Sequence, residues 1–135
     1  MTQTRLEQVK AIMPSEGTDL VDVFGADAPQ IDTGGLVRDD ATVNMLARSA
    51  ERATEGPEGF REIWADWLEP WASYRIYYDE VIERGDRVIM LTRLRGVTKH
   101  GNVEMEHEAA AVFRFEGDQV VEMDFTLERE DALKD

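Results

Sequence analysis

Two side chains could do chemistry from positions that the sequence predicts to be inside the fold. His107 shares the parity of Met105 and Ala109 in an expected strand, and this parity should face inward. An imidazole beside an apolar cavity would stay neutral and could take or give a proton near pH 7. The alternative interpretation is a half-buried histidine at the cavity rim, satisfied by a backbone carbonyl or by a tyrosine hydroxyl.

Arg93 is the second candidate. If it has the inward parity of Ile89 and Leu91, its guanidinium could bind a carboxylate or an enolate. The alternative is an ion pair with a glutamate of the neighbouring strand, which contributes little if it is exposed. Those glutamates are Glu104, Glu106 and Glu108. Asp124 has the outward parity of its strand, which favours a surface or dimer-face residue over a general base.

The strands that must position these groups lie between Gly85 and Leu127. Hydrophobic periodicity and turn residues predict three of them, with tight turns at Gly101-Asn102 and at Glu116-Gly117-Asp118. The three predicted strands are Arg87–Arg95, Val103–Phe115 and Gln119–Leu127, and a fourth, Trp71–Ile82, precedes them.

Apolar residues also occur at the outward parity of these strands. They are Val88, Met90, Ala110 and Val112. Outward apolar side chains need cover, and the sheet of a second copy would provide it. The pattern therefore predicts a homodimer that forms through the outer sheet face.

The segments outside these strands are mostly helices and loops. Apolar spacing predicts helices over Thr4–Met13, from a cap at Thr18 or Asp19 through Phe24, over Pro57–Leu68, and over Glu128–Leu133. Loops are expected over Gly25–Asp40 and Ala50–Gly56. Thr42–Ala47 fits a short strand or a helical turn.

The order of the elements indicates an α+β fold. Helices come first and an antiparallel meander follows, so the helix Pro57–Leu68 must lay its apolar stripe on a sheet face. Its tryptophans would then lie across the concave side of a curved sheet. A chain of 135 residues is typical of a single domain.

Composition excludes several kinds of function. A formal charge of −14 argues against nucleic-acid binding, because a phosphate backbone needs a basic surface. The absence of cysteine excludes disulfides and thiolate metal sites. The two histidines should lie far apart along a hairpin, so no metal site is expected.

Motifs for cofactors and for targeting are also missing. The sequence has no glycine-rich phosphate loop and no nucleotide fingerprint, so no cofactor is expected. No apolar run is long enough to predict a signal peptide or a membrane span. These observations favour a cytoplasmic protein that does not bind membranes.

Three segments together carry a family resemblance. They are GPEGFREIWADWLEPW, GDRVIMLTRLRG and AAAVFRFEGDQVVEMDFTLEREDAL, within residues 57–133. This part of the chain resembles the SnoaL-like polyketide cyclase family, in the nuclear transport factor 2 superfamily. The resemblance implies one SnoaL-like domain over residues 1–135, cone-shaped, with an interior cavity and often in a homodimer. It leaves the reaction open, because the fold hosts isomerases, dehydratases, cyclases, epoxide hydrolases and non-catalytic binders.

The catalytic residues of the superfamily can be compared position by position. Ketosteroid isomerases place an acidic hydrogen-bond donor where this sequence has Ala111, and they use a tyrosine that the first helix lacks here. Limonene epoxide hydrolases use an arginine, which Arg87 matches, and two aspartates, whose positions hold Ile89 and Phe125. Scytalone dehydratases and SnoaL-type cyclases use histidine and aspartate as acid–base groups, and only His107 echoes that pattern.

Two classes of function follow. One is a cofactor-free acid–base isomerase, cyclase or dehydratase that acts on a small apolar molecule, which predicts at least two convergent polar groups deep in the cavity. The other is a non-catalytic domain that binds an apolar ligand or dimerises, which predicts one such group or none. The expected pocket residues are Trp64, Tyr78, Ile89, Met105, Met123 and Phe125.

Overall fold

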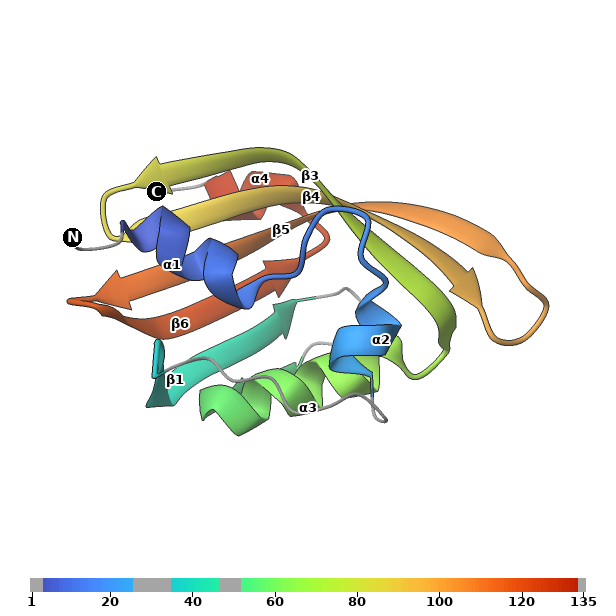
Figure 1. Cartoon of the computed structure of the whole chain (residues 1–135), viewed down its shortest axis with the longest axis horizontal. Helices are drawn as coiled ribbons and strands as arrows, with labels where there is room; N and C mark the ends of the chain where they lie inside the picture. The colour runs from blue at the N-terminus through green and yellow to red at the C-terminus, as the bar shows by residue number, and fades with distance from the viewer. Residues whose placement is uncertain (1–3, 26–34, 47–51, 134–135) are drawn as a thin grey trace.

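Six strands form one mixed sheet (Figure 1). The structure, a computed structural model, describes residues 4–25, 35–46 and 52–133. In chain order the strands are β1 (Val37–Leu46), β2 (Arg52–Glu55), β3 (Trp71–Arg84), β4 (Arg87–Thr98), β5 (Glu104–Glu116) and β6 (Gln119–Thr126). Their order in the sheet is β2-β1-β6-β5-β4-β3. β1 runs parallel to β6, and the other neighbouring pairs are antiparallel.

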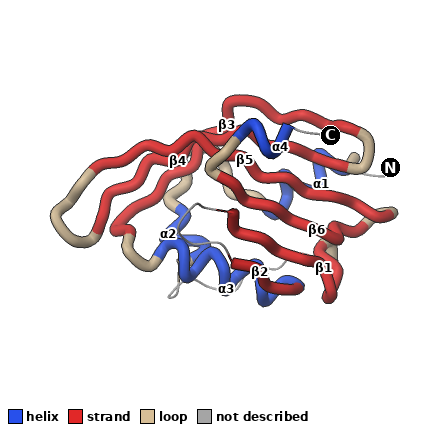
Figure 2. Tube along the Cα trace, turned by 180° about the vertical axis from the view of Figure 1, so that it is seen from behind, coloured by secondary structure: helices blue, strands red, loops and turns tan. Residues whose placement is uncertain are grey.

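Helices lie on both faces of this curved sheet (Figures 1 and 2). In the described part of the chain they are α1 (Arg5–Ile12), α2 (Leu20–Phe24), α3 (Gly56–Leu68) and α4 (Arg129–Leu133). The first three lie on the concave face, and α4 lies on the other. The arrangement confirms the predicted α+β class, with N-terminal helices on the concave face. The parallel pairing of β1 with β6 was not predicted.

α3 covers the concave face because its apolar residues recur at helical spacing. Pro57 stands in the first turn, where a helix needs no amide donor. The buried side chains of the helix are Phe60, Ile63, Trp64 and Leu68. The ring centre of Phe60 lies 5.3 Å from that of Phe24 in α2 and 5.9 Å from that of Phe125 in β6. These contacts join α3 to a second helix and to the sheet.

α1 is tied to the sheet through its first residue. Arg5 donates hydrogen bonds to the carbonyl oxygens of Gly85 and Gly117, at 3.1 and 3.4 Å. Its guanidinium carbon lies 5.5 Å from the centre of the Phe115 ring. Gly85 and Gly117 belong to the turns that join β3 to β4 and β5 to β6. Two hairpin turns therefore fix the start of the helix.

The inward and outward residues of β4 are the reverse of the prediction. Val88 and Met90, expected to face outward, lie in the main core between the sheet and the helices. Ile89 and Leu91, expected to face inward, lie in a second cluster on the opposite face. All four side chains are buried, at most 8% exposed. This part of the strand therefore has no alternation of apolar and polar residues from which its faces could be read.

The second cluster is covered by α4 of the same chain. Ala110 and Val112 of β5 lie in it with Ile89 and Leu91, and Ala132 of α4 packs against them. The outward apolar residues thus have cover within the monomer, so the reason given above for a homodimer was wrong. The oligomeric state itself stays a prediction, which light scattering at micromolar concentration tests.

Arg129, the first residue of α4, holds this helix on the sheet. It donates hydrogen bonds to the backbone carbonyls of Thr92 and Ala109, at 2.6 and 3.2 Å. It also donates to the carboxylate of Asp79 at 2.7 Å. Asp79 is an extra residue in a bulge of β3, and it accepts a further hydrogen bond from Arg93 at 2.8 Å. The bonds from Arg129 and then from Arg93 lower the pKa of the Asp79 carboxyl.

Two stretches that were predicted as loops contain strand residues. β1 begins at Val37, inside the predicted loop Gly25–Asp40, and β2 occupies most of the predicted loop Ala50–Gly56. β2 is a four-residue edge strand with a polar sequence, so it lacks the apolar run of a central strand. For Thr42–Ala47 the strand alternative is correct as far as Leu46.

Residues 26–34 and 47–51 lie outside the described residues, and so do the parts of the predictions that fall on them. Of the helices that the structure describes, none has the length and apolar character that a membrane crossing requires.

Candidate functional site

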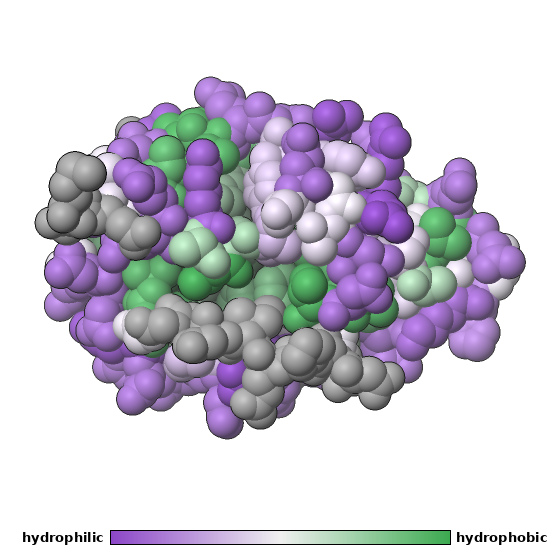
Figure 3. All heavy atoms as spheres, viewed as in Figure 1, coloured by the Kyte–Doolittle hydropathy of each residue, from purple (hydrophilic) through white to green (hydrophobic). Residues whose placement is uncertain are grey.

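A small cavity lies between the helices and the concave face of the sheet. Trp64 and Trp67 of α3 form part of its wall, together with Met13, which follows α1. Inward residues of the sheet that line it include Ile76, Thr92, Leu94, Ala109, Ala111 and Phe125. The space open to a water-sized molecule is about 30 Å³, which is room for about two water molecules. Figure 3 shows hydrophobic residues gathered in the recessed middle of this face, with hydrophilic residues around them.

Two alanines leave this space open. Ala109 and Ala111 occupy successive inward positions of β5, and both line the cavity. At the next inward position Phe113 is fully buried and fills the core. Because each of these two alanines has a side chain of one carbon atom, the space between β5 and α3 is not filled.

The cavity wall is apolar apart from a few polar atoms. Trp64 is 4% exposed, and its indole Nε1 has no hydrogen-bond partner among the residues that the structure describes. Thr92 is equally buried and lies on the inward face of β4, opposite Ala109. The Thr126 hydroxyl is engaged, because it accepts a hydrogen bond from the amide of Glu128 at 3.0 Å. No ionisable side chain occurs among the described residues of the lining.

His107 lies on the inward face, beyond the cavity rather than in its lining. Its Nδ1 is 3.0 Å from the hydroxyl of Tyr74, and the ring of Trp71 stands nearly perpendicular to the imidazole. Burial lowers the pKa of His107. It also raises the pKa of Tyr74 to about 12, a rise that the indole of Trp67 partly opposes. Both groups are therefore neutral near pH 7, and the geometry is that of a half-buried histidine satisfied by a tyrosine hydroxyl.

The lowered pKa predicts how His107 affects stability. The unfolded chain takes up a proton on this residue at a higher pH than the folded protein does. Stability should therefore fall as the pH drops below the ordinary histidine value of about 6.5. His107→Gln removes this dependence, so wild type should lose stability relative to the variant between about pH 7.5 and about pH 5. Urea denaturation of both proteins measures the difference. An imidazole pKa above 6.5 by NMR would contradict the expectation.

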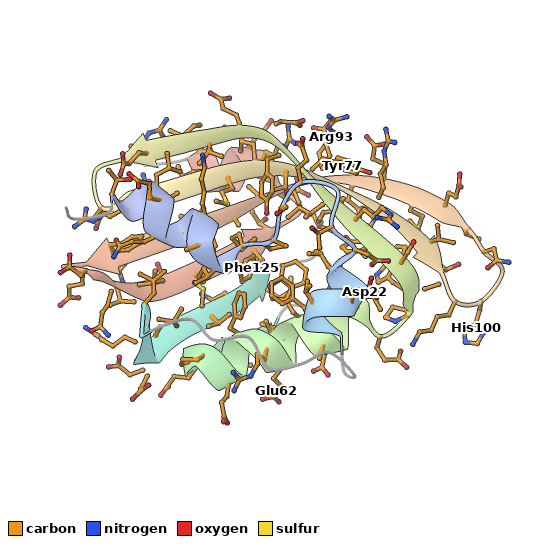
Figure 4. The ribbon with its side chains drawn as sticks, viewed as in Figure 1. Asp22, Glu62, Tyr77, Arg93, His100 and Phe125 are labelled. Atoms are coloured by element: carbon orange, nitrogen blue, oxygen red, sulfur yellow. The ribbon has the colours of Figure 1, made fainter. Side chains whose placement is uncertain are left out.

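Arg93 lies on the outer face, so the hypothesis that it binds a substrate group beside the cavity, which required the inward parity, does not hold. It has the parity of Ile89, which belongs to the outer cluster. Its Nε donates to the Asp79 carboxylate at 2.8 Å, and its side chain is 42% exposed. Figure 4 shows Arg93 at the outside of the molecule and Phe125 in its interior. The alternative prediction, that Arg93 forms an ion pair, is correct. Its hydrogen-bonded partner, however, is Asp79 of β3 and not a glutamate of β5.

The expected pocket residues separate into several groups. Trp64 and Phe125 line the cavity, and Met123 is fully buried in the core without reaching the lining. Met105 is 45% exposed and lies near the start of β5, in the β4–β5 hairpin. Ile89 faces the opposite side of the sheet, so the prediction that it lines the pocket was wrong.

Tyr78, the sixth expected pocket residue, lines a separate groove next to the cavity. Its hydroxyl donates to the carbonyl oxygen of Pro14 at 2.6 Å.

Met13 and Thr92 also line the cavity, although neither was predicted to do so. For Thr92 the reason is that the inward and outward faces of β4 were predicted in reverse. A signal was present further along the strand, where Arg93 and Arg95 alternate with Leu94. If the arginines are assigned to the solvent-facing side of β4, then Thr92 and Leu94 are predicted to face inward.

Comparisons with known proteins agree on the fold. A model of the SnoaL-like domain family matches residues 18–123. A candidate SnoaL-like polyketide cyclase from Jannaschia sp. CCS1 superposes with a TM-score of 0.67 at 17% identity, over 93% of this chain and 89% of that one. A candidate isomerase from Rhodopseudomonas palustris gives a TM-score of 0.64 at 13% identity, over 93% and 90%.

A further solved structure has a higher sequence identity. An uncharacterised cystatin-fold protein from Novosphingobium aromaticivorans is 23% identical, with a TM-score of 0.59 over 92% of this chain and 98% of that one. No curated protein matches the chain. At these identities the structural likeness defines the fold alone.

Proposed function

Because the chain belongs to the SnoaL-like domain family, we propose that it binds a small apolar molecule in the cavity beneath α3. The proposal concerns binding and not a reaction. General acid–base catalysis needs an ionisable group within hydrogen-bond reach of the substrate. The described lining of the cavity supplies none.

The observation that carries the proposal is the indole N–H of Trp64. Trp64 lines an apolar cavity, and its buried indole N–H has no hydrogen-bond partner within the described part of the chain. A buried donor without a partner costs about 1–3 kcal/mol, which an acceptor in the cavity would offset. A ligand with one ketone or ether oxygen supplies that acceptor, while its apolar body packs against the surrounding side chains. The class of ligand is therefore a small apolar molecule with a single oxygen acceptor.

The size of the cavity sets a condition on binding. A space of about 30 Å³ holds no organic ligand until side chains of its wall move. Met13, Trp64 and Trp67 lie at its helical side. Because Trp64 is to hold the ligand, Met13 and Trp67 are the side chains that must move, and methionine adapts its shape at low cost because it is unbranched. Binding should therefore accompany rearrangement of these two side chains.

Ala111→Leu tests the proposal. Leucine adds three carbon atoms to the floor of the cavity, so the affinity for small aryl ketones such as acetophenone should fall by about tenfold or more, which is about 1.4 kcal/mol. Isothermal titration calorimetry with a panel of such ketones measures it. Ala72→Leu is the control, because Ala72 is exposed in β3. Ala109→Val is a smaller filling variant for the case in which Ala111→Leu does not fold. A filled cavity that binds as well as wild type would refute the assignment.

A second candidate function is acid–base chemistry at the Tyr74–His107 pair. The 3.0 Å contact between two groups that can exchange a proton favours it, and both lie on the face that carries the cavity. A substrate would have to extend from the cavity past Ala109 to reach the imidazole. His107→Gln distinguishes the two candidates, since an enzyme would lose turnover while a binding domain would keep its affinity.

A further inference from the structure

A larger groove adjoins the cavity. It lies between the end of α1, with the residues that follow, and the β3–β4 side of the concave face. Its volume is about 390 Å³, which falls within the range of about 300–1,000 Å³ of small-molecule sites. Apolar side chains of Met13, Val81 and Met90 form much of its wall.

Met13 is the side chain that the groove and the cavity share. It follows the last residue of α1, and its amide donates to the carbonyl of Val9 at 3.1 Å, so its backbone is fixed. Its side chain is 7% exposed and has three freely rotating bonds. A change of rotamer at Met13 would open the cavity into the groove and leave the helix in place.

The polar groups of the groove differ in what remains available to a ligand. The Tyr78 hydroxyl already donates to Pro14, and the Tyr78 amide donates to the Glu16 carboxylate at 3.1 Å. The side chain of Lys10 has no hydrogen bond or ion pair with any residue that the structure describes. The groove therefore offers an unengaged ammonium group at its rim, in a protein whose formal charge is −14.

We propose that the ligand of this domain is an elongated apolar keto acid with one carboxylate. Its apolar, ketone-bearing end passes Met13 into the cavity, where the ketone oxygen accepts from Trp64. Its carboxylate stays in the groove and pairs with Lys10. Glu16, on the same wall, repels a second negative charge, so a dicarboxylate binds more weakly. This inference rests on the proposed function, because it takes the cavity as the site of the apolar end.

The probe is gamma-benzoylbutyrate, a phenyl ketone with a carboxylate at its far end, compared with its neutral primary amide. At low salt, wild type should bind the acid about fivefold more tightly than the amide, the size of a partly exposed ion pair. Lys10→Gln should remove this preference, so that the variant binds the acid no more tightly than the amide. Lys99→Gln is the matched control, because Lys99 is exposed at the far end of the β4–β5 hairpin. It should bind both compounds as wild type does.

The outcomes separate the two proposals. If wild type binds the amide and the acid equally and Lys10→Gln changes neither affinity, the keto-acid inference is overturned and the proposed function stands. If neither compound nor any small ketone binds, both fail. Met13→Ala tests the route independently, since it removes the side chain that must move. It should raise the affinity for acid and amide alike by about threefold or more, and an unchanged or lower affinity for both would overturn the route.

Discussion

Phe60→Ala is expected to lower the free energy of unfolding by about 3–5 kcal/mol, the range for phenylalanines removed from a core. The side chain is 0% exposed, and its ring contacts Phe24 and Phe125. Removing it leaves a hole where α2, α3 and the sheet meet. The melting temperature should fall by roughly 10 °C or more for a domain of this size. Urea and thermal denaturation measure both quantities.

Two further variants make this result specific. Phe60→Leu keeps most of the volume and should cost much less than Phe60→Ala. Glu62→Ala alters a side chain that points away from the sheet in Figure 4, and should change stability by about 0.5 kcal/mol or less. If Phe60→Ala costs no more than Glu62→Ala, then α3 is not held on the sheet by this aromatic contact, and the roof of the cavity is misidentified.

Gly96→Ala is expected to destabilise the protein by about 1–3 kcal/mol, although it adds a single methyl group. A Cβ atom at this position would lie 2.5 Å from two ring carbons of Trp71 and 2.7 Å from a ring carbon of Tyr74. Both rings are buried, so they can yield only by moving their neighbours. The Tyr74 hydroxyl would move with its ring, and its hydrogen bond to His107 would weaken.

A double-mutant cycle tests this cause. In a Trp71→Leu background the smaller side chain leaves room for the new methyl, so Gly96→Ala should cost clearly less there than in wild type. Equal costs in the two backgrounds would show that the penalty does not come from the ring of Trp71. Free energies from urea denaturation of the four proteins give the answer.

The sequence predicted the faces of β5 correctly and those of β4 incorrectly, for one physical reason. In β5, inward His107 and Ala109 alternate with outward glutamates, so the charged residues identify the solvent-facing side of the strand. In β4, Val88 and Ile89 are both fully buried, because helices cover one face and α4 covers the other. A strand covered on both sides carries no period-two signal over its buried part. Ile89 was assigned to the wrong face for that reason, and the face of Arg93 could not be decided.

Other features depend on contacts between distant parts of the chain. The link from Arg129 to Asp79 and to two strand carbonyls joins residues far apart in sequence, and no local pattern encodes it. The bulge at Asp79 also shifts the faces of β3 after Tyr78, which a strict alternation cannot anticipate. The size of the cavity follows from how closely the tryptophans of α3 approach the two alanines of β5. That distance is a result of packing and is absent from composition or periodicity.

The resemblance to the SnoaL-like family predicted the fold correctly. The residues that line the cavity restrict which functions are chemically possible. The enzyme hypothesis predicts at least two polar groups that converge deep in the cavity. Trp64, Thr92 and Thr126 are polar, but none of them is an acid or a base near pH 7, and His107 lies outside the lining. These residues are the basis for our proposal that the site holds an apolar molecule by one or two hydrogen bonds.

The most direct measurement follows the indole N–H signals of nitrogen-15-labelled protein during titration with an apolar ketone. The chain has three tryptophans, of which Trp64 and Trp67 line the cavity and Trp71 does not. The Trp64 proton should move downfield as it gains an acceptor, and the Trp71 signal should stay in place. A saturating ketone that leaves Trp64 unmoved, or that shifts Trp71 instead, would contradict binding beneath α3.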